Sequence, residues 1–107
     1  MIHEWREYTI APGKSADLHK RFEEVTEPLF KKHGIKALGY WNVVVGENPK
    51  LVYLCEFEDL SHRERAWASF FSDPEWIAGR VASEKNGALT LRVANTILSP
   101  TKYSAIQ

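Results

Sequence analysis

The sequence predicts an α+β domain in which four strands and two helical segments follow one another in the order βαββαβ. Three observations support this order: period-two alternation of apolar residues near both ends of the chain, a hairpin pattern in its middle, and two segments with helical spacing. It is the split βαβ, or ferredoxin-like, arrangement, a four-stranded antiparallel sheet with the helices on one face. The 107 residues match the size of one domain, so we assign residues 1–107 to a single domain.

The first third of the chain reads as a strand followed by a long helix. Residues 3–10 mix β-branched, aromatic and charged residues with period two, which predicts a strand. Ser15 is the expected N-cap of a helix that ends near residue 34. The apolar positions of this helix fall on one face: Leu18, Phe22, Val25 and Leu29. Because Pro28 lacks a backbone N–H, we expect a kink or a break near residues 26–27.

The rest of the chain supplies the other strands and the second helical segment. Residues 35–45 and 51–58 are rich in β-branched and aromatic residues and are separated by a turn sequence, which predicts a hairpin. A helix is expected over residues 62–72, and Asp73-Pro74-Glu75 has the N-cap, proline and first-turn acid that start another. Residues 88–99 alternate apolar and polar side chains, which predicts the fourth strand.

The composition excludes several functions. The chain carries 14 Lys and Arg against 14 Asp and Glu, so it lacks the basic excess of a nucleic-acid-binding protein. It has no apolar run long enough to span a membrane and no apolar signal peptide, and its one cysteine cannot form an internal disulfide, so we expect a cytoplasmic protein. The four histidines lack metal-ligand spacing, and no nucleotide-binding or serine hydrolase motif occurs. We therefore expect no cofactor and no metal, with haem ligation by a single histidine, His19 or His62, as the alternative.

The predicted architecture leaves one face of the sheet without helices. Aromatic residues make up 12% of the chain, including four Trp, which is high for a chain of this size and indicates a large interface or a lined cavity besides the core. Contact of an apolar, aromatic sheet face with water is unfavourable, so we expect a homodimer formed by stacking two uncovered sheet faces. Such a pairing encloses an interior suited to a small apolar or aromatic ligand.

The candidate site residues come from the strand alternation. The first strand places a carboxylate, a guanidinium and a phenol in line at Glu4, Arg6 and Tyr8, and these are the candidate catalytic residues. The candidate ligand-binding residues are Tyr53, Cys55, Tyr40 and Arg92. Period two does not say which set of side chains faces the helices. In the fourth strand, Leu89, Leu91 and Val93 are assigned to the helix side, which leaves Arg92, Ala94, Thr96 and Leu98 on the open face.

Four patches of the chain, in the same order, resemble the NIPSNAP family. Residues 4–14 resemble its E-L-R-x-Y-x-L-x-P-G-K opening, residues 39–41 its G-Y-W strand, residues 73–76 its D-P-E-W helix start and residues 97–101 its terminal I-L-x-P-T. The resemblance implies a dimeric α+β barrel, a superfamily that includes cofactor-free monooxygenases and isomerase-like proteins, without implying one activity. Family members often have His on the third strand in a V-V-H-L-W pattern, where this chain has Tyr53. The resemblance therefore implies no imidazole-based role at that position.

Each candidate residue has a structural and a functional interpretation. Glu4 and Arg6 form either a structural ion pair at the dimer seam or a pair that orients a substrate, with Tyr8 as hydrogen-bond donor. Tyr53 either packs as an aromatic residue or donates to a ligand, and Cys55 is either an inert buried thiol or a reactive one. Two functions follow: a cofactor-independent small-molecule enzyme of monooxygenase or isomerase type, or a non-catalytic module that binds a small ligand or another protein.

Overall fold

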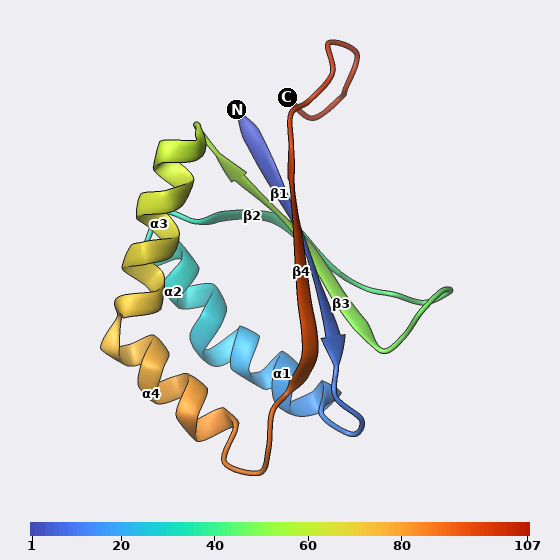
Figure 1. Cartoon of the computed structure of the whole chain (residues 1–107), viewed down its shortest axis with the longest axis vertical. Coiled ribbons are helices and arrows are strands. Elements are labelled where there is room, and N and C mark those ends of the chain that lie inside the picture. Colours follow the sequence, from blue (N-terminus) through green and yellow to red (C-terminus); the bar gives the residue numbers. More distant parts are fainter.

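The helices all lie on one face of a four-stranded antiparallel sheet, as the order of elements predicted (Figure 1). The computed structural model describes residues 1–107. Its strands are β1 (Ile2–Ile10), β2 (Lys36–Asn42), β3 (Lys50–Phe57) and β4 (Thr90–Leu98), hydrogen-bonded in the order β2-β3-β1-β4. β1 therefore lies inside the sheet, between β3 and β4, and β4 is an edge strand.

The first helical segment changes its pitch instead of breaking. It consists of α1 (Ser15–Arg21), the π-helical turn η1 (Phe22–Thr26) and α2 (Glu27–Lys32). Pro28 cannot donate to a carbonyl one turn back, and the N–H of Glu27 bonds instead to the carbonyl of Phe22, five residues away. The distortion expected near residues 26–27 is therefore present as a wider turn. The predicted cap at Ser15 is wrong: Ser15 begins the helix, and the capping position is Lys14, whose side chain makes no capping hydrogen bond.

The second helical segment divides at Asp73, as its sequence predicted. α3 (Leu60–Ser72) begins after Asp59, whose side chain accepts from the N–H of His62, and α4 (Pro74–Ser83) begins after Asp73, whose side chain accepts from the N–H of Glu75. The Asp73 carboxylate also binds Lys32 at 2.9 Å and His33 at 2.7 Å. One carboxylate thus joins the end of α2 to the junction of α3 and α4.

The core lies between the helices and the sheet face that they cover. Its largest fully buried apolar and aromatic side chains come from both layers, namely Leu18, Phe30, Tyr53, Phe57, Phe70 and Leu89. On the sheet, Tyr8, Tyr40 and Tyr53 belong to this side, since their rings contact Phe22 of the helical layer. No helix of the chain has both the length and the hydropathy needed to cross a membrane.

The opposite sheet face and much of β4 carry exposed apolar side chains. Trp41 is 49% exposed and stacks on Trp5 at 6.0 Å on the face without helices. On β4, Leu91, Val93 and Ile97 are also exposed although they point to the helix side, because β4 packs against β1 and lies apart from the helices. The assignment of Val93 to the helix side and of Arg92 to the open face is confirmed by their pairing with Tyr8 and Thr9.

Helix α4 approaches η1 closely at Gly79. A Cβ atom on Gly79 would lie 2.7 Å from Cγ1 of Val25, a contact that a β-branched side chain cannot readily relieve. We expect Gly79→Ala to lower the free energy of unfolding by about 1 to 2 kcal/mol through overpacking, although alanine favours a helix over glycine by about 1 kcal/mol. In urea unfolding, Gly79→Ala should therefore cost much less stability in the Val25→Ala variant than in the wild type, which is a favourable coupling between the two substitutions. Additive costs would contradict this explanation.

Candidate functional site

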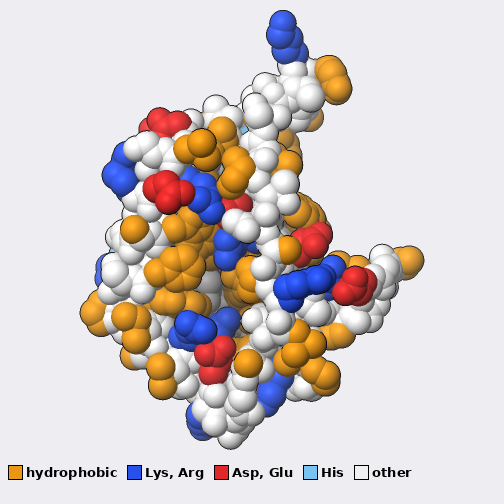
Figure 2. Space-filling model, viewed as in Figure 1, with side chains coloured by type: hydrophobic (Ala, Val, Ile, Leu, Met, Phe, Trp, Pro, Cys, Tyr) orange, Lys and Arg blue, Asp and Glu red, His pale blue; other side chains and the backbone are white.

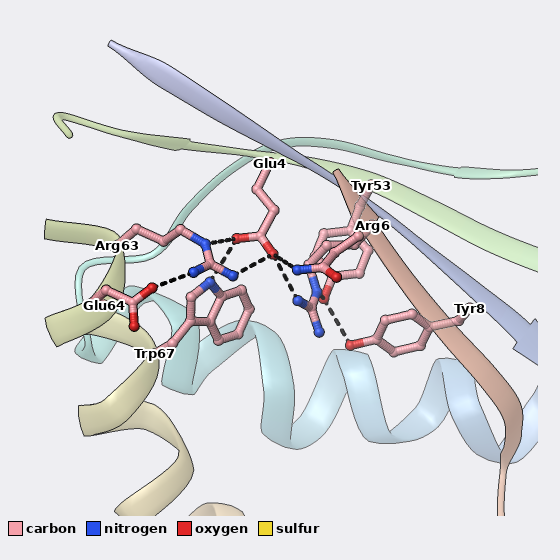
Figure 3. Close-up of polar contacts among 8 residues, drawn as sticks. Glu4, Arg6, Tyr8, Tyr53, Arg63, Glu64 and Trp67 are labelled. Atoms are coloured by element: carbon pink, nitrogen blue, oxygen red, sulfur yellow. Dashed lines mark hydrogen bonds and ion pairs between the residues drawn. The ribbon is translucent and has the colours of Figure 1, made fainter. Parts of the chain in front are cut away.

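The carboxylate of Glu4 is fully buried and is the centre of a polar cluster (Figure 3). Its Oε1 accepts from Nε of Arg63 at 2.8 Å and from Nε1 of Trp67 at 2.9 Å. Its Oε2 accepts from Nη1 of Arg6 at 2.9 Å, from Nδ2 of Asn95 at 3.0 Å and from Nη2 of Arg63 at 3.2 Å. These donors come from β1, α3 and β4, so one carboxylate connects an inner strand, an edge strand and the helical layer.

The surroundings of Glu4 keep it ionised. Burial alone would raise its pKa, but the hydrogen bonds from Arg63, Asn95 and Trp67 and the charge of Arg6 lower the pKa to about 2. With five donors on its two oxygens, the carboxylate has little capacity left for another partner. Glu4 is therefore a positioning group and is unsuited to act as a general base.

Glu4 and its neighbours fix the side chain of Arg6. Nη1 of Arg6 donates to Glu4, Nε donates to the hydroxyl of Tyr53 at 2.8 Å, and the guanidinium lies 4.5 Å from the centre of the Trp67 ring. Burial opposes the charge of Arg6, but Tyr53, Tyr8 and Glu4 favour it and raise its pKa above the ordinary value. Nη2 makes none of these hydrogen bonds, so Arg6 holds a fixed, permanently charged donor for another group.

The hydroxyl of Tyr8 completes the cluster. It lies 2.8 Å from the hydroxyl of Tyr53, which is fully buried, while Tyr8 itself is only partly buried (Figure 3). Because Tyr53 accepts from Arg6, it can donate its own proton to Tyr8 and leave the proton of Tyr8 for a ligand. The chain Glu4, Arg6, Tyr53, Tyr8 thus directs two donors, one charged and one neutral, toward the same region.

This region is a hollow between the helices and β4. Figure 2 shows the molecule hollowed between the helical layer and β4, with hydrophobic and Lys or Arg side chains on the walls. We call this space the hollow. Arg6 and Tyr8 point from β1 into the layer between the sheet and the helices, and their cross-strand partners Asn95 and Val93 lie beside them on β4. A cavity of about 280 Å³ follows its helical wall, lined by Phe71, Trp76, Ile77, Arg80, Val81 and Glu84.

The position of the Glu4, Arg6 and Tyr8 line differs from the expectation of an interior formed by stacked uncovered faces. All three side chains point to the helix-covered face, where Glu4 bonds to α3 and Tyr8 packs on Phe22. The ion pair of Glu4 and Arg6 lies within one chain and not across a seam between copies. Arg92 is separated from the line, because it pairs with Thr9 on the opposite face and is exposed.

Two of the other candidate residues lie behind the site. Tyr53 is fully buried, and burial is the main cause that raises its pKa well above the usual value, so it acts through Arg6 and Tyr8. Cys55 pairs with Glu4 across β1 and β3 and is also fully buried. Burial, partly opposed by the charge of Arg6, raises the pKa of its thiol to about 12. This thiol is protonated at neutral pH and is inert as a nucleophile.

Tyr40 belongs to a separate pocket. Its hydroxyl donates to Glu27, and burial together with this carboxylate raises its pKa above the ordinary value. The pocket has a volume of about 230 Å³ between the first helical segment and the sheet, and it is lined by His19, Phe22, Glu23, Glu27, Tyr40 and Leu51. Tyr40 and the Arg6 cluster therefore do not act on one ligand atom.

The most important partners of Glu4 and Arg6 were not among the predicted residues. Arg63 and Trp67 lie four residues apart on α3 and reach the same carboxylate, and Asn95 reaches it from β4. A further guanidinium, that of Arg21, is buried on α1 and lies 5.3 Å from the centre of the Trp76 ring. Its sequence signal was a charged residue within the apolar stripe of the helix, three residues after Leu18 and four before Val25.

A second polar line, Ser69, His33 and Asp73, has the residue types of a hydrolase triad. Nδ1 of His33 lies 2.5 Å from Oγ of Ser69, and Nε2 lies 2.7 Å from the Asp73 carboxylate. However, Ser69 lies in the interior of α3, where backbone N–H groups bond within the helix and cannot form an oxyanion hole. Asp73 is also occupied by Lys32 and the N–H of Glu75. We therefore assign this line to the junction of the helices.

The fold and the cluster define a class: a single-sheet α+β protein of ferredoxin-like architecture with a polar site between its sheet and its helices. The family model described as NIPSNAP matches residues 3–105, and the chain belongs to the NIPSNAP family. The resemblance in the four sequence patches is thereby confirmed. No curated protein matches the chain.

Solved structures agree with this family. An uncharacterized NIPSNAP-like domain protein from Burkholderia xenovorans is 27% identical, with a TM-score of 0.85 over 96% of this chain and 87% of that chain. A NIPSNAP family protein of unknown function from Agrobacterium tumefaciens is 23% identical, with a TM-score of 0.88 over 100% of this chain and 94% of that chain. An antibiotic biosynthesis monooxygenase shares the fold at 13% identity, with a TM-score of 0.61 over 94% and 99% of the two chains.

The buried Glu4 predicts a characteristic loss of stability in acid. A pKa lowered from 4.5 to about 2 corresponds to about 3 kcal/mol of stability at neutral pH. Since the folded pKa is the lower one, this stability is present above about pH 4.5 and is lost as the pH falls to about 2. Glu4→Gln should be less stable at pH 7, and its stability should fall less between pH 4.5 and pH 2, in urea unfolding.

Glu64→Gln is the matched control for this prediction. Glu64 also accepts from Arg63, at 2.6 Å, but its side chain is 72% exposed. Its removal should change the stability by less than about 1 kcal/mol at any pH, because an exposed ion pair contributes little. Equal acid sensitivity of the wild type and Glu4→Gln would show that Glu4 does not carry this dependence.

Proposed function

We propose that this protein binds a small, mostly apolar molecule in the hollow and polarises one oxygen atom of that molecule with Arg6 and Tyr8. The observation that carries this proposal is the fixed Arg6 guanidinium beside a partly accessible Tyr8 hydroxyl. Both groups donate hydrogen bonds, and Arg6 adds a permanent charge, so they favour an oxygen on which negative charge develops. Enolates and phenolates are oxygens of this kind.

This arrangement supports a cofactor-independent enzyme of monooxygenase or isomerase type. Such reactions pass through an enolate or phenolate, and the hollow offers donors for its oxygen next to aromatic walls. The shared fold with an antibiotic biosynthesis monooxygenase adds to this support at the level of architecture. In this proposal Arg6 and Tyr8 contact the reacting oxygen, while Glu4 and Tyr53 position them.

Binding without turnover is the second candidate, and a specific observation favours it. The three buried acids of the site are poor proton acceptors: Glu4 is occupied by five donors, and Tyr53 and Cys55 remain protonated at neutral pH. Abstraction of a proton would therefore need an acceptor outside this set. Oxygen uptake and deuterium incorporation into a bound phenol or ketone, measured at saturation, separate the candidates, since a binding module shows neither.

The hydroxyl of Tyr8 provides the test of the proposed site. We expect Tyr8→Phe to weaken binding about 3- to 10-fold, which corresponds to the loss of one hydrogen bond. Native mass spectrometry of freshly purified protein and a thermal-shift screen with 1-naphthoate, cinnamate and 1,4-naphthoquinone select the ligand, and calorimetry measures its affinity. Tyr40→Phe is the matched control, because it removes a phenol hydroxyl from a different pocket. Equal effects of both variants would reject the site.

We also propose that the protein is a homodimer formed through the sheet face without helices. Trp41, stacked on Trp5, is half-exposed there, and a stable interface needs an apolar centre of this kind. Sedimentation at micromolar concentration should report twice the chain mass of 12.3 kDa. The variant Trp41→Arg should reduce the measured mass to that of a single chain. The variant Leu60→Arg, at a similarly exposed position on α3, should leave the dimer intact. A single-chain mass for the wild type would refute the proposal.

A further inference from the structure

The side chain of Arg21 is buried without a close carboxylate. Arg21 is only 8% exposed, its Nη1 donates to Oγ of Ser83 at 3.3 Å, and the nearest carboxylate oxygen, on Glu84, lies 3.9 Å away. Glu84 is itself bound by Arg80 at 3.2 Å. The Nε atom of Arg21 is buried and has no hydrogen-bond partner. A guanidinium stays charged at all accessible pH values, so this positive charge is poorly compensated.

The surrounding arginines add to this excess of positive charge. The buried carboxylate of Glu4 is shared by two guanidiniums, those of Arg6 and Arg63. Burial disfavours the charge of Arg21 and lowers its pKa, although Tyr8 and Glu84 partly oppose this effect. Arg6 and Arg63 thus share the one fully buried carboxylate, and Arg21 has only the partly exposed Glu84 near it. A ligand with a negative charge would compensate this region.

Arg21 and Arg6 both pack against aromatic rings of the helical wall. The guanidinium of Arg6 lies 4.5 Å from the centre of the Trp67 ring, and that ring stacks on Phe71, which lines the cavity of the helical wall. Above Arg21 lies Trp76, which lines the 280 Å³ cavity of the helical wall together with Glu84. Figure 2 shows Lys or Arg side chains at two places within the hollow, separated by hydrophobic ones. An anion and an apolar body can therefore be held side by side.

We propose that the ligand of the hollow is an organic anion, an apolar acid whose carboxylate lies between Arg6 and Arg21 and accepts from Tyr8. This inference rests on the proposed binding in the hollow and makes the oxygen held by Arg6 and Tyr8 a carboxylate oxygen, which favours binding over turnover. The apolar part of the acid lies along Trp76 and Phe71 of the helical wall and Val93 of β4. A cavity of about 280 Å³ lies just below the range of ligand sites, about 300 to 1,000 Å³, and so suits one or two rings better than a long lipid chain.

The test compares acids with their neutral primary amides, which have nearly the same shape. The pairs are 1-naphthoate with 1-naphthamide, cinnamate with cinnamamide, and salicylate with salicylamide. At pH 7 we expect at least one acid to bind 10-fold or more tightly than its amide, because charge-assisted hydrogen bonds are about twice as strong as neutral ones. In NMR spectra of the wild-type protein, this acid should shift the Nε–Hε resonances of both Arg6 and Arg21.

Variants of two arginines separate a specific contact from a general charge effect. Arg21→Met should weaken binding of the acid about 10- to 100-fold and change the affinity of the amide less than about 2-fold. Arg65→Met is the control: it removes an exposed guanidinium of α3 that bonds to Ser61 and does not line the cavity, so it should contribute little. Arg21→Lys, which keeps the charge, should recover part of the affinity for the acid.

The outcomes distinguish this inference from the proposed function. If acid and amide of a binding pair bind equally, or if only the Arg6 resonance shifts, the ligand is not an anion held by Arg21, although the hollow remains a binding site. If no compound binds and iodide, used as a small anion probe, leaves the Arg21 resonance unchanged up to 100 mM, both proposals are rejected. Since the resonances are read in the wild type, the result holds even where a variant fails to fold.

Discussion

The burial of the Glu4 carboxylate is the constraint on which the rest of the site depends. A buried charge costs several kcal/mol unless it is fully paired and hydrogen-bonded. Here the donors come from β1, α3 and β4, so all three elements must be in register before the carboxylate is satisfied. Arg63 and Trp67 meet this requirement because they lie one helical turn apart on the face of α3 that covers the sheet. The polar cluster therefore orients the helical layer on the sheet.

The same constraint decides what the site can do chemically. A carboxylate that holds five donors gives up its role as a base and becomes the group that fixes Arg6. Arg6 in turn orders Tyr53, and Tyr53 orders Tyr8, so each hydrogen bond sets the direction of the next. The result is a preorganised set of donors without a nearby proton acceptor. Such a site is suited to hold or stabilise a negative oxygen. The lack of a base and the excess of positive charge at the site both follow from the pairing of Glu4.

The sequence was sufficient to predict the helices and strands, but it was insufficient to predict which face of each strand meets the helices. The strands and the Asp73-Pro74 helix start could be predicted because alternation, capping and proline act locally. The period-two alternation separates Glu4, Arg6 and Tyr8 from their neighbours. It does not show which side of the strand faces the helices, so the helix-facing position of these three residues could not be predicted. Arg63 and Asn95 lie 59 and 91 residues from Glu4, and no local pattern joins them. The buried Arg21 left a trace, a charge within an apolar stripe, which periodicity treats as an irregularity.

The edge strand β4 shows how the two faces of the sheet are connected. Its helix-facing side chains stay exposed because β4 packs on β1 and lies apart from the helices, and the molecule is hollowed between β4 and the helical layer. In one chain β4 is held by its ladder with β1 and by the bond from Asn95 to Glu4. A partner packed on the opposite face would support β4 from behind without filling the hollow. Association on one face and an accessible polar site on the other are therefore compatible requirements of the same strand.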